Sequence, residues 1–597
     1  MEKTGKGCEQ MRKRVGIGHQ DFEKIREKNL FYVDKTAFIR EWWENEDEVT
    51  LITRPRRFGK TLNISMLEKF FSVQYAGRED LFQGLAIWEE EKYRILQGTY
   101  PVISLSFANV KEDNFFQTRR KICQILTNLY STNHFLMEQE ILDDKEKLFF
   151  QSVSADMDNM TATMAIYQLS FYLSRHYGKK VIILLDEYDT PMQEAYIHGY
   201  WEEIVSFIRS MFNATFKTNP YLERAIMTGI TRVSKESIFS DLNNLEVITT
   251  TSEKYADCFG FTEGEVFAAL DEYGLSEKKE EVKAWYDGFI FGNRKDIYNP
   301  WSILNYIDKR QVGTYWTNSS SNSLVGKLIR EGNAEIKMVM ERLIQGEAFH
   351  TSFDEQIVFN QLDQNDSAVW SLLMASGYLK PEYAKFNLEI GKMEYTLKLT
   401  NREVYFMFQH MIEGWFNGCR QVHNAFLQAL LSHDLEGMNE YMNEISDESF
   451  SSFDTGKKPS GAQPERFHSV EATTKGLKEP NPSVCFYHGF VLGLMVELRG
   501  QYSISSNKES GYGHYDIMME PREKGADAFI IEFKVVHTKR GETLESAVQA
   551  ALKQIEEKRY DAELCHRGVP REKIRKYGFA FSGKDVMIGE TIEQTGK

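Results

Sequence analysis

Residues 49–67 read VTLITRPRRFGKTLNISML, and this stretch decides the fold of the first half of the chain. The apolar run Val49–Thr53 predicts a short buried strand, and Leu62–Phe71 has the pattern of a helix. The tripeptide Gly59-Lys60-Thr61 falls at the turn between them. At such a turn, backbone N–H groups converge on a phosphate, a lysine reaches the β- and γ-phosphates, and a hydroxyl ligates Mg²⁺. The stretch therefore predicts a phosphate-binding loop for ATP and Mg²⁺.

The loop departs from the G-x-x-x-x-G-K-[ST] pattern at its first position, where Arg54 replaces glycine. Glycine eases a tight turn there, so this loop must turn differently. We predict that Arg54 and Arg57 direct positive charge toward the phosphates. The alternative is that these arginines are solvated or pair with acids elsewhere.

Two later segments complete the predicted site. VIILLDEYDTP (residues 181–191) places Asp186 and Glu187 directly after a buried strand. We predict that Asp186 and Thr61 hold the Mg²⁺ shell and that Glu187 activates the attacking water. AIMTGITRVS (residues 225–234) follows, with Thr231 and Arg232 as candidate γ-phosphate contacts. A helix cap and a surface arginine are the alternative for this pair.

A second group of acids lies in GYGHYDIMMEP (residues 511–521) and GADAFIIEFKVV (residues 525–536). Glu532 and Lys534 are two apart on a β-type run, so their side chains share one face of a strand. Together with Asp516, Glu532 has the chemistry of a Mg²⁺ site, and Lys534 can stabilise a pentacovalent phosphate. We predict Asp516, Glu532 and Lys534 as catalytic residues of phosphodiester hydrolysis, with surface charges as the alternative.

Length and composition limit the classes of protein. A chain of 597 residues exceeds one hydrophobic core, so we expect several domains. The net charge of −16 argues against coating nucleic acid by bulk charge, although a local basic groove is compatible with it. Six scattered cysteines without a C-x-x-C pair indicate reduced thiols. No long apolar run and no apolar leader are found, so we expect a cytoplasmic protein without a membrane segment.

The order of patterns predicts an α/β fold with three folded parts. We place a parallel-sheet domain at 15–250 and a helical, winged-helix-like connector at 251–450. A linker or insertion at 451–483 holds four of the twelve prolines. A smaller α/β domain follows at 484–588. Its patterns are a helix over Phe486–Leu498, strands from Tyr502 to Val536, and a helix over Leu544–Tyr560.

Residues 15–305 resemble the AAA-ATPase-like family of bacterial and mobile-element proteins. The resemblance rests on five segments: GIGHQDFEKIREKNLFYVDKT (16–36), LITRPRRFGKTLNISML (51–67), LLDEYDTP (184–191), TGITRVSKESIFSDLNNL (228–245) and WYDGFIFG with YNPWSIL (285–304). RPRRFGKT is typical of that family, so Arg54 is not peculiar to this chain. The resemblance implies P-loop ATPase roles for Lys60, Thr61, Asp186 and Glu187.

Residues 484–588 resemble the PD-(D/E)XK nuclease superfamily. The matching segments are FYHGFVLGLM (486–495), SNKESGYGHYDIMMEP (506–521), IIEFKV (530–535), ALKQIEEKRY (551–560) and YGFAFSGKDV (577–586). The resemblance assigns core positions to Asp516, Glu532 and Lys534, and a supporting position to Gln554. Relatives commonly carry a glutamate before the FYHG helix, where this chain reads Pro482-Ser483-Val484-Cys485.

We expect a Mg²⁺-dependent ATPase joined to a nuclease domain that acts on DNA or RNA, with no membrane partner. A second hypothesis is a non-enzymatic ATP-dependent switch. A third is an active ATPase whose nuclease-like part is inactive and binds nucleic acid or protein. Arg54 and the absent glutamate keep these alternatives open, and the sequence does not determine the oligomeric state or the substrate.

Overall fold

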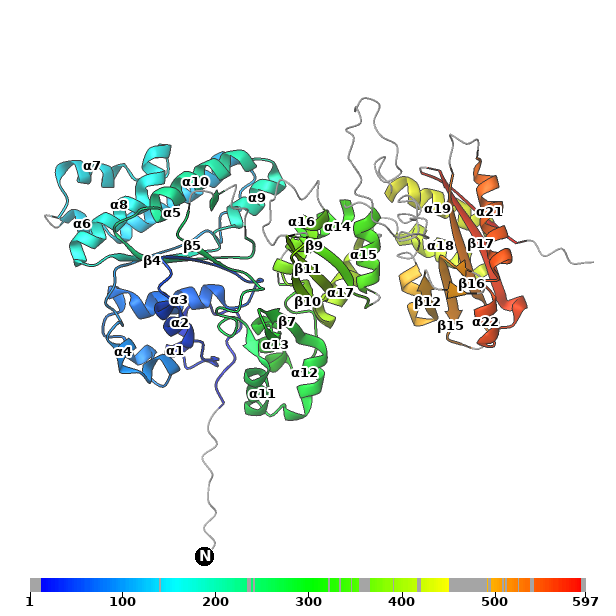
Figure 1. Ribbon diagram of the computed structural model, residues 1–597, viewed down its shortest axis with the longest axis horizontal. Helices are drawn as coiled ribbons and strands as arrows, with labels where there is room; N and C mark the ends of the chain where they lie inside the picture. The colour runs from blue at the N-terminus through cyan, green and yellow to red at the C-terminus, as the bar shows by residue number, and fades with distance from the viewer. Residues whose placement is uncertain are drawn as a thin grey trace, which may run out of the picture. The chain divides into compact units, whose positions relative to one another are not determined.

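The computed structural model describes residues 12–138, 141–232, 238–239, 242–319, 323–331, 334–344, 346–353, 366–389, 391–415, 420–449, 491, 495–506, 509–510, 513–523, 525–536, 542–582 and 584–591. The chain forms two compact units (Figure 1). The N-terminal unit comprises residues 1–328 and 346–407, and the C-terminal unit comprises residues 329–345 and 408–597. The predicted linker at 451–483 and most of the helix predicted at Phe486–Leu498 lie outside the described residues.

A five-stranded parallel sheet forms the centre of the N-terminal unit, in the order β2-β3-β4-β1-β5. The strands are β1 (Val49–Thr53), β2 (Val102–Ser106), β3 (Val181–Asp186), β4 (Leu222–Gly229) and β5 (Leu245–Ile248). Every residue of β1 and β3 is buried, as their continuous apolar runs predict. Because β4 lies between β1 and β3, the loops after these three strands meet at one edge of the sheet.

Helices cover both faces of this sheet. On one side lie α2 (Ala37–Asn45) and α3 (Lys60–Phe71), and on the other lie α5 (Phe115–Thr132), α8 (Asn159–Tyr177) and α10 (Trp201–Phe216) (Figure 1). The helix predicted at Leu62–Phe71 is confirmed, and it begins two residues earlier, at Lys60. The parallel α/β sheet predicted for this part is therefore confirmed.

Residues 251–407 combine helices with two small antiparallel sheets. Helices α11 (Glu263–Glu272), α12 (Lys279–Tyr286) and α13 (Pro300–Lys309) pack with β6 (Phe261–Thr262), β7 (Asp287–Phe291) and β8 (Arg294–Tyr298). Helix α16 (Asp366–Ala375) precedes the hairpin of β10 (Leu379–Asn387) and β11 (Lys392–Leu399), which pairs with β9 (Phe349–Phe353). The winged-helix-like character expected of this region stays a prediction. Helix α17 (Arg402–Trp415) comes next.

The conspicuous Asp34-Lys35-Thr36 segment is a structural junction. Asp34 accepts hydrogen bonds from the Thr36 hydroxyl at 2.7 Å and from the Ala86 N–H at 2.7 Å. Lys35 forms a 2.7 Å ion pair with Glu265. This segment therefore ties the start of α2 to the start of α11.

The C-terminal unit contains a mixed five-stranded sheet in the order β12-β15-β16-β17-β18. Its strands are β12 (Tyr502–Ser506), β15 (Ile517–Pro521), β16 (Ala528–Val535), β17 (Ile574–Ser582) and β18 (Asp585–Glu590). Strands β16 and β17 are parallel, and the other neighbours are antiparallel. Helices α21 (Leu544–Lys558) and α22 (Ala562–His566) pack against one face.

Helices α18 (Arg420–Ser432) and α19 (Leu435–Ser449) cover the other face. Asn439 and Asn443 of α19 each bond both the N–H and the carbonyl of one residue of edge strand β18, at 2.8 to 2.9 Å. The predicted connector thus contains helices that share the core of the C-terminal sheet. The boundaries proposed at 250, 450 and 483 stay predictions. No helix among the described residues has the length and apolar character needed to cross a membrane.

Candidate functional site

The predicted phosphate loop lies where β1 passes into α3. Gly59 is the N-cap of α3 with a φ of +85°, a conformation that favours glycine. Lys60 is the first residue of the helix and is 5% exposed. Its ammonium group donates hydrogen bonds to the carbonyls of Arg54 and Pro55, both at 2.9 Å. The side chain of Lys60 therefore connects the start of α3 to the first residues of the loop.

Three side chains, from helix α3 and from strands β3 and β4, meet beside this lysine. Thr61 donates a 2.7 Å hydrogen bond to one oxygen of Asp186, and Thr228 donates a 2.5 Å bond to the other. Asp186 is 2% exposed, so burial raises its pKa, while the two threonine hydroxyls oppose that shift. The fold thus brings together the hydroxyl and the carboxylate predicted to share one Mg²⁺ ion.

Glu187 follows at the rim of the site. It is half-buried, and its φ of +51° is a costly conformation for a residue with a side chain. Its carboxylate accepts a 3.3 Å hydrogen bond from the Thr190 hydroxyl. Burial lowers the pKa of Lys60, and the negative charges of Glu187 and Asp186 oppose that shift. The two acids therefore favour the charged form of the Lys60 side chain.

The loop after β4 is held by Asp189, which the sequence-based prediction omits. One oxygen of this buried carboxylate accepts bonds from the N–H groups of Ile230 and Thr231 and from the Thr231 hydroxyl, at 2.8 to 3.0 Å. Burial raises the pKa of Asp189, and these bonds oppose it. The hydroxyl of Thr231 is thus committed to Asp189, and Arg232 is half-buried beside it. The second aspartate of the DEYD sequence, Asp189, was the available signal.

Arg54 points away from the loop that it begins. Its guanidinium is fully buried and donates to the carbonyls of Thr53 at 3.0 Å and Thr249 at 2.5 Å. It also lies 4.6 Å from the centre of the Phe291 ring. Burial lowers the pKa of Arg54 to about 10. The structure therefore places the main-chain carbonyl of Arg54, not its charge, beside Lys60.

Arg57 adopts a left-handed conformation with a φ of +66°. Its guanidinium stacks 4.4 Å from the centre of the Trp301 ring and donates a 3.5 Å bond to the Ser319 carbonyl. Asn299 donates a 3.2 Å bond to the carbonyl of Arg56. Arg56 and Arg57 of the loop are therefore tied to the segment 299–319.

A mostly apolar pocket opens beside Gly59. Its walls come from the N-terminal segment, from α3 and from α13. The lining includes Phe31, Tyr32, Val33, Leu62, Asn63, Pro300 and Leu304. Because Leu62 and Asn63 follow Thr61 directly, this pocket adjoins the phosphate loop.

In the C-terminal unit, one predicted acid lies just before β15 and the other lies on the neighbouring strand β16. Asp516 precedes β15 and accepts a 2.7 Å hydrogen bond from the N–H of Phe533. Glu532 and Lys534 of β16 share a face and form a 3.1 Å ion pair, while Phe533 packs into the opposite core. The register of β15 against β16 therefore brings the three predicted residues to one place.

Gln554 of α21 completes this group. Its carbonyl oxygen accepts a 2.8 Å bond from Lys534, and its amide donates to Glu532. Glu532 is 2% exposed, and one of its carboxylate oxygens, Oε2, is buried without a hydrogen-bond partner. Burial, with Asp516 nearby, raises the pKa of Glu532 to about 8. An acceptor oxygen left over in a buried acidic site fits a divalent cation.

Seven basic residues around and after Gln554 are candidates for phosphate contacts: Lys553, Lys558, Arg559, Arg571, Lys573, Arg575 and Lys576. Five of these seven form ion pairs with acids. These five are Lys553, Arg571, Lys573, Arg575 and Lys576. Asp527 alone binds Lys573 at 3.3 Å and Arg575 at 2.9 Å. These pairs favour a structural role over a nucleic-acid surface.

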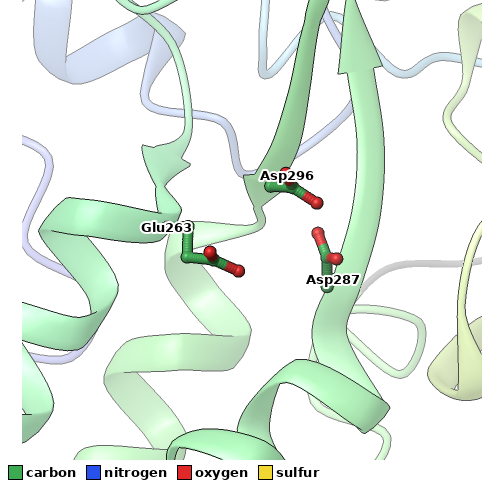
Figure 2. A group of neighbouring side chains, drawn as sticks. All are labelled: Glu263, Asp287 and Asp296. Atoms are coloured by element: carbon green, nitrogen blue, oxygen red, sulfur yellow. The ribbon is translucent and has the colours of Figure 1, made fainter.

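Another acidic group, Glu263, Asp287 and Asp296, carries carboxylate oxygens that lie within 4.8 Å of one another (Figure 2). Lys283 forms an ion pair with Glu263, and Tyr298 donates a 3.3 Å bond to the same carboxylate. Burial, and then the adjacent Asp296, raise the pKa of Asp287 to about 6. A cationic side chain such as Lys283, and a proton shared between Asp287 and Asp296, can balance the negative charge of this group. We therefore assign no ligand to it.

Comparison with known proteins agrees with these two centres. Residues 16–239 match a family described as a predicted AAA-ATPase, and residues 485–591 match the PD-(D/E)XK nuclease superfamily. A relative described as an uncharacterized protein in the vnfD 5' region of Azotobacter chroococcum mcd 1 is 28% identical over 371 residues. That alignment covers 62% of this chain and 64% of the relative, less than two thirds of its length. The chain thus contains one segment similar to predicted AAA-ATPases and a C-terminal segment similar to the PD-(D/E)XK nuclease superfamily.

Proposed function

We propose that this protein binds ATP with Mg²⁺ at the Lys60–Asp186 site and hydrolyses it. The observation that carries the proposal is the bond between Thr61 and Asp186 beside a buried lysine at a helix N-terminus. On binding, Lys60 exchanges two carbonyl partners for phosphate oxygens. The N–H groups at the start of α3 face the same anion.

The chain's own residues supply the remaining chemistry. Thr61 and Asp186 would hold the cation, whose charge offsets the charge that develops on the phosphoryl group. Glu187 accepts a proton from the attacking water and orients it. The apolar pocket beside Leu62 and Asn63 takes the nucleotide base.

The test of ATP binding uses the whole chain. Isothermal titration with ATP and Mg²⁺ is compared between the wild type and Lys60→Ala. We expect the variant to lose at least a hundredfold in affinity, because a buried charge-assisted contact to phosphate is removed. Arg224→Ala is the control, since Arg224 donates to the carbonyls of Trp42 and Trp43 instead of the loop. Equal affinities for the wild type and Lys60→Ala would falsify the proposal.

We also propose a Mg²⁺-dependent phosphodiesterase site at Asp516, Glu532 and Lys534, acting on DNA or RNA. The buried unpartnered oxygen of Glu532 supports it. The cation would be held by Asp516 and Glu532, and it would activate water and polarise the phosphate. Lys534 neutralises the charge that develops on the phosphate, and Gln554 keeps Lys534 oriented.

The nuclease test incubates single- and double-stranded DNA and RNA with the protein and Mg²⁺ or Mn²⁺. We expect cleavage by the wild type and none by Asp516→Ala. Binding of nucleic acid without cleavage would favour the inactive, binding form of this domain. Cleavage that persists in Asp516→Ala comes from another protein in the preparation.

A further inference from the structure

A carboxylate that the proposed mechanism does not use is buried against the segment 299–319, which contacts the phosphate loop. Glu403, on α17, is 0% exposed, and burial raises its pKa to about 7. One oxygen accepts bonds from the N–H groups of Trp316 at 2.5 Å and Thr317 at 3.4 Å. The other accepts a 2.8 Å bond from the Ser302 hydroxyl. Burying a carboxylate costs free energy because the group loses its water. We expect such a buried acid where its hydrogen bonds hold the surrounding backbone in place.

The groups that Glu403 holds lie next to the groups that contact Arg57. Ser302 follows Trp301, whose ring lies under the Arg57 guanidinium at 4.4 Å. The indole N–H of Trp301 donates a 3.1 Å bond to the Tyr315 carbonyl, next to Trp316. The hydroxyl of Ser319 donates a 2.6 Å bond to the Trp316 carbonyl.

The same segment supports the loop at two other points. The Ser319 carbonyl accepts the 3.5 Å bond from Arg57, and Asn299 holds the carbonyl of Arg56 at 3.2 Å. The indole of Trp316 lines a pocket with Arg56 and Thr231. Because Arg57 has a positive φ, its conformation is unfavourable for a residue with a side chain and needs such support.

We propose that Glu403 is a positioning residue for the phosphate loop, acting through the segment 299–319 on Arg57. The carboxylate fixes the N–H groups of Trp316 and Thr317, and the fixed segment holds Arg57 and the loop in one conformation before nucleotide arrives. This inference rests on the proposed ATP site. Preorganisation of this kind lowers the entropy lost on binding.

The experiment compares ATP affinity, with Mg²⁺, among four variants and the wild type. Glu403→Ala should raise the Kd about tenfold, which corresponds to about 1.4 kcal/mol. Glu403→Gln should stay within threefold, because its carbonyl can accept from Trp316 and its amide can donate to Ser302. Trp301→Leu, which leaves the carboxylate intact, should also raise the Kd. Thr215→Val removes a buried hydroxyl of α10 and should leave the Kd unchanged.

A second readout needs no nucleotide. Amide hydrogen exchange of residues 54–60 should be faster in Glu403→Ala than in the wild type, and Thr215→Val should not change it. Wild-type affinity and wild-type exchange in Glu403→Ala would overturn the inference. So would an equal loss of affinity in Thr215→Val, since general destabilisation would then explain both. If the wild type binds no ATP, the proposed function fails, while the exchange rates still decide whether Glu403 holds the loop. Should Glu403→Ala not fold, Trp301→Leu decides by the same two measurements.

Discussion

The hydroxyl of Thr61 donates a 2.7 Å hydrogen bond to the carboxylate of Asp186, although the two residues lie 125 positions apart in the chain. Strand β4 lies between β1, which leads into the helix that carries Thr61, and β3, which ends at Asp186. Thr228 near the end of β4 bonds the second oxygen of Asp186. The parallel sheet therefore brings a hydroxyl at the start of a helix and a strand-end acid into contact.

Thr61→Val should abolish the increase in ATP affinity that Mg²⁺ causes, because valine keeps the shape of threonine but lacks the oxygen ligand. The Kd for ATP is measured with Mg²⁺ and with EDTA. Thr127→Val, which removes an intrahelical hydroxyl of α5, should keep the wild-type response. A full Mg²⁺ effect in Thr61→Val would show that Thr61 is not a ligand.

Glu187→Gln should bind ATP like the wild type and lose turnover by about 100-fold or more, because the amide cannot accept the proton of the attacking water. Phosphate release under single-turnover conditions measures this step. Glu203→Gln, at an exposed position of α10, is the control. Unchanged turnover in Glu187→Gln would remove Glu187 from its assigned role.

Arg54→Gly should lower the free energy of unfolding of the N-terminal unit by about 3 kcal/mol, although it restores the more common loop pattern. The buried guanidinium bonds the carbonyls of Thr53 and Thr249, which would lose a charged donor. Urea unfolding measures the change. Arg120→Ala, at an exposed ion pair with Asp156, should cost less than about 1 kcal/mol. A glycine variant as stable as the wild type would contradict a structural role for Arg54.

Mg²⁺ binding at the C-terminal site should strengthen as the pH rises toward about 8. Burial raises the pKa of Glu532 to that value, so below it the carboxyl is protonated and must lose its proton to bind the cation. Titration calorimetry in buffers of different ionisation enthalpy measures the proton release. Glu532→Gln should bind weakly at every pH. Binding that is independent of pH between 6 and 8 would show that Glu532 is already ionised.

The same shift affects stability. A carboxyl with a raised pKa retains a proton in the folded state that the unfolded chain has lost, so its contribution to the unfolding free energy falls as the pH rises from about 4.5 to about 8. In the absence of metal, the unfolding free energy of Glu532→Gln should lack this decrease between about pH 4.5 and about pH 8.

Asn443→Ala should lower the unfolding free energy of the C-terminal unit by about 1 to 3 kcal/mol. Its side chain satisfies the N–H and the carbonyl of Val586 on edge strand β18, at 2.9 and 2.8 Å. Glu440→Ala, exposed on the same helix, is the control. If Asn443→Ala and Glu440→Ala gave equal unfolding curves, water would replace the hydrogen bonds of the Asn443 amide without a loss of stability.

Local sequence determined the strands, the loop and the candidate acids. The apolar run of β3 predicts a buried strand, and the positions of Lys60 at a turn and of Asp186 after that strand carry their own chemical meaning. The alternation of Glu532, Phe533 and Lys534 likewise predicts which side chains share a face.

Tertiary structure alone decided which way Arg54 points and what Glu403 holds. The sequence around Arg54, five residues before Gly59, would be the same whether its guanidinium faced a phosphate or the Thr249 carbonyl. That carbonyl lies 195 positions away in the chain. Glu403 and Trp316 are 87 positions apart in the chain. Asn443 of α19 bonds Val586 of β18, which is 143 positions away. Periodicity describes the face of one element, whereas a buried polar group is satisfied by whichever distant backbone the packing brings to it.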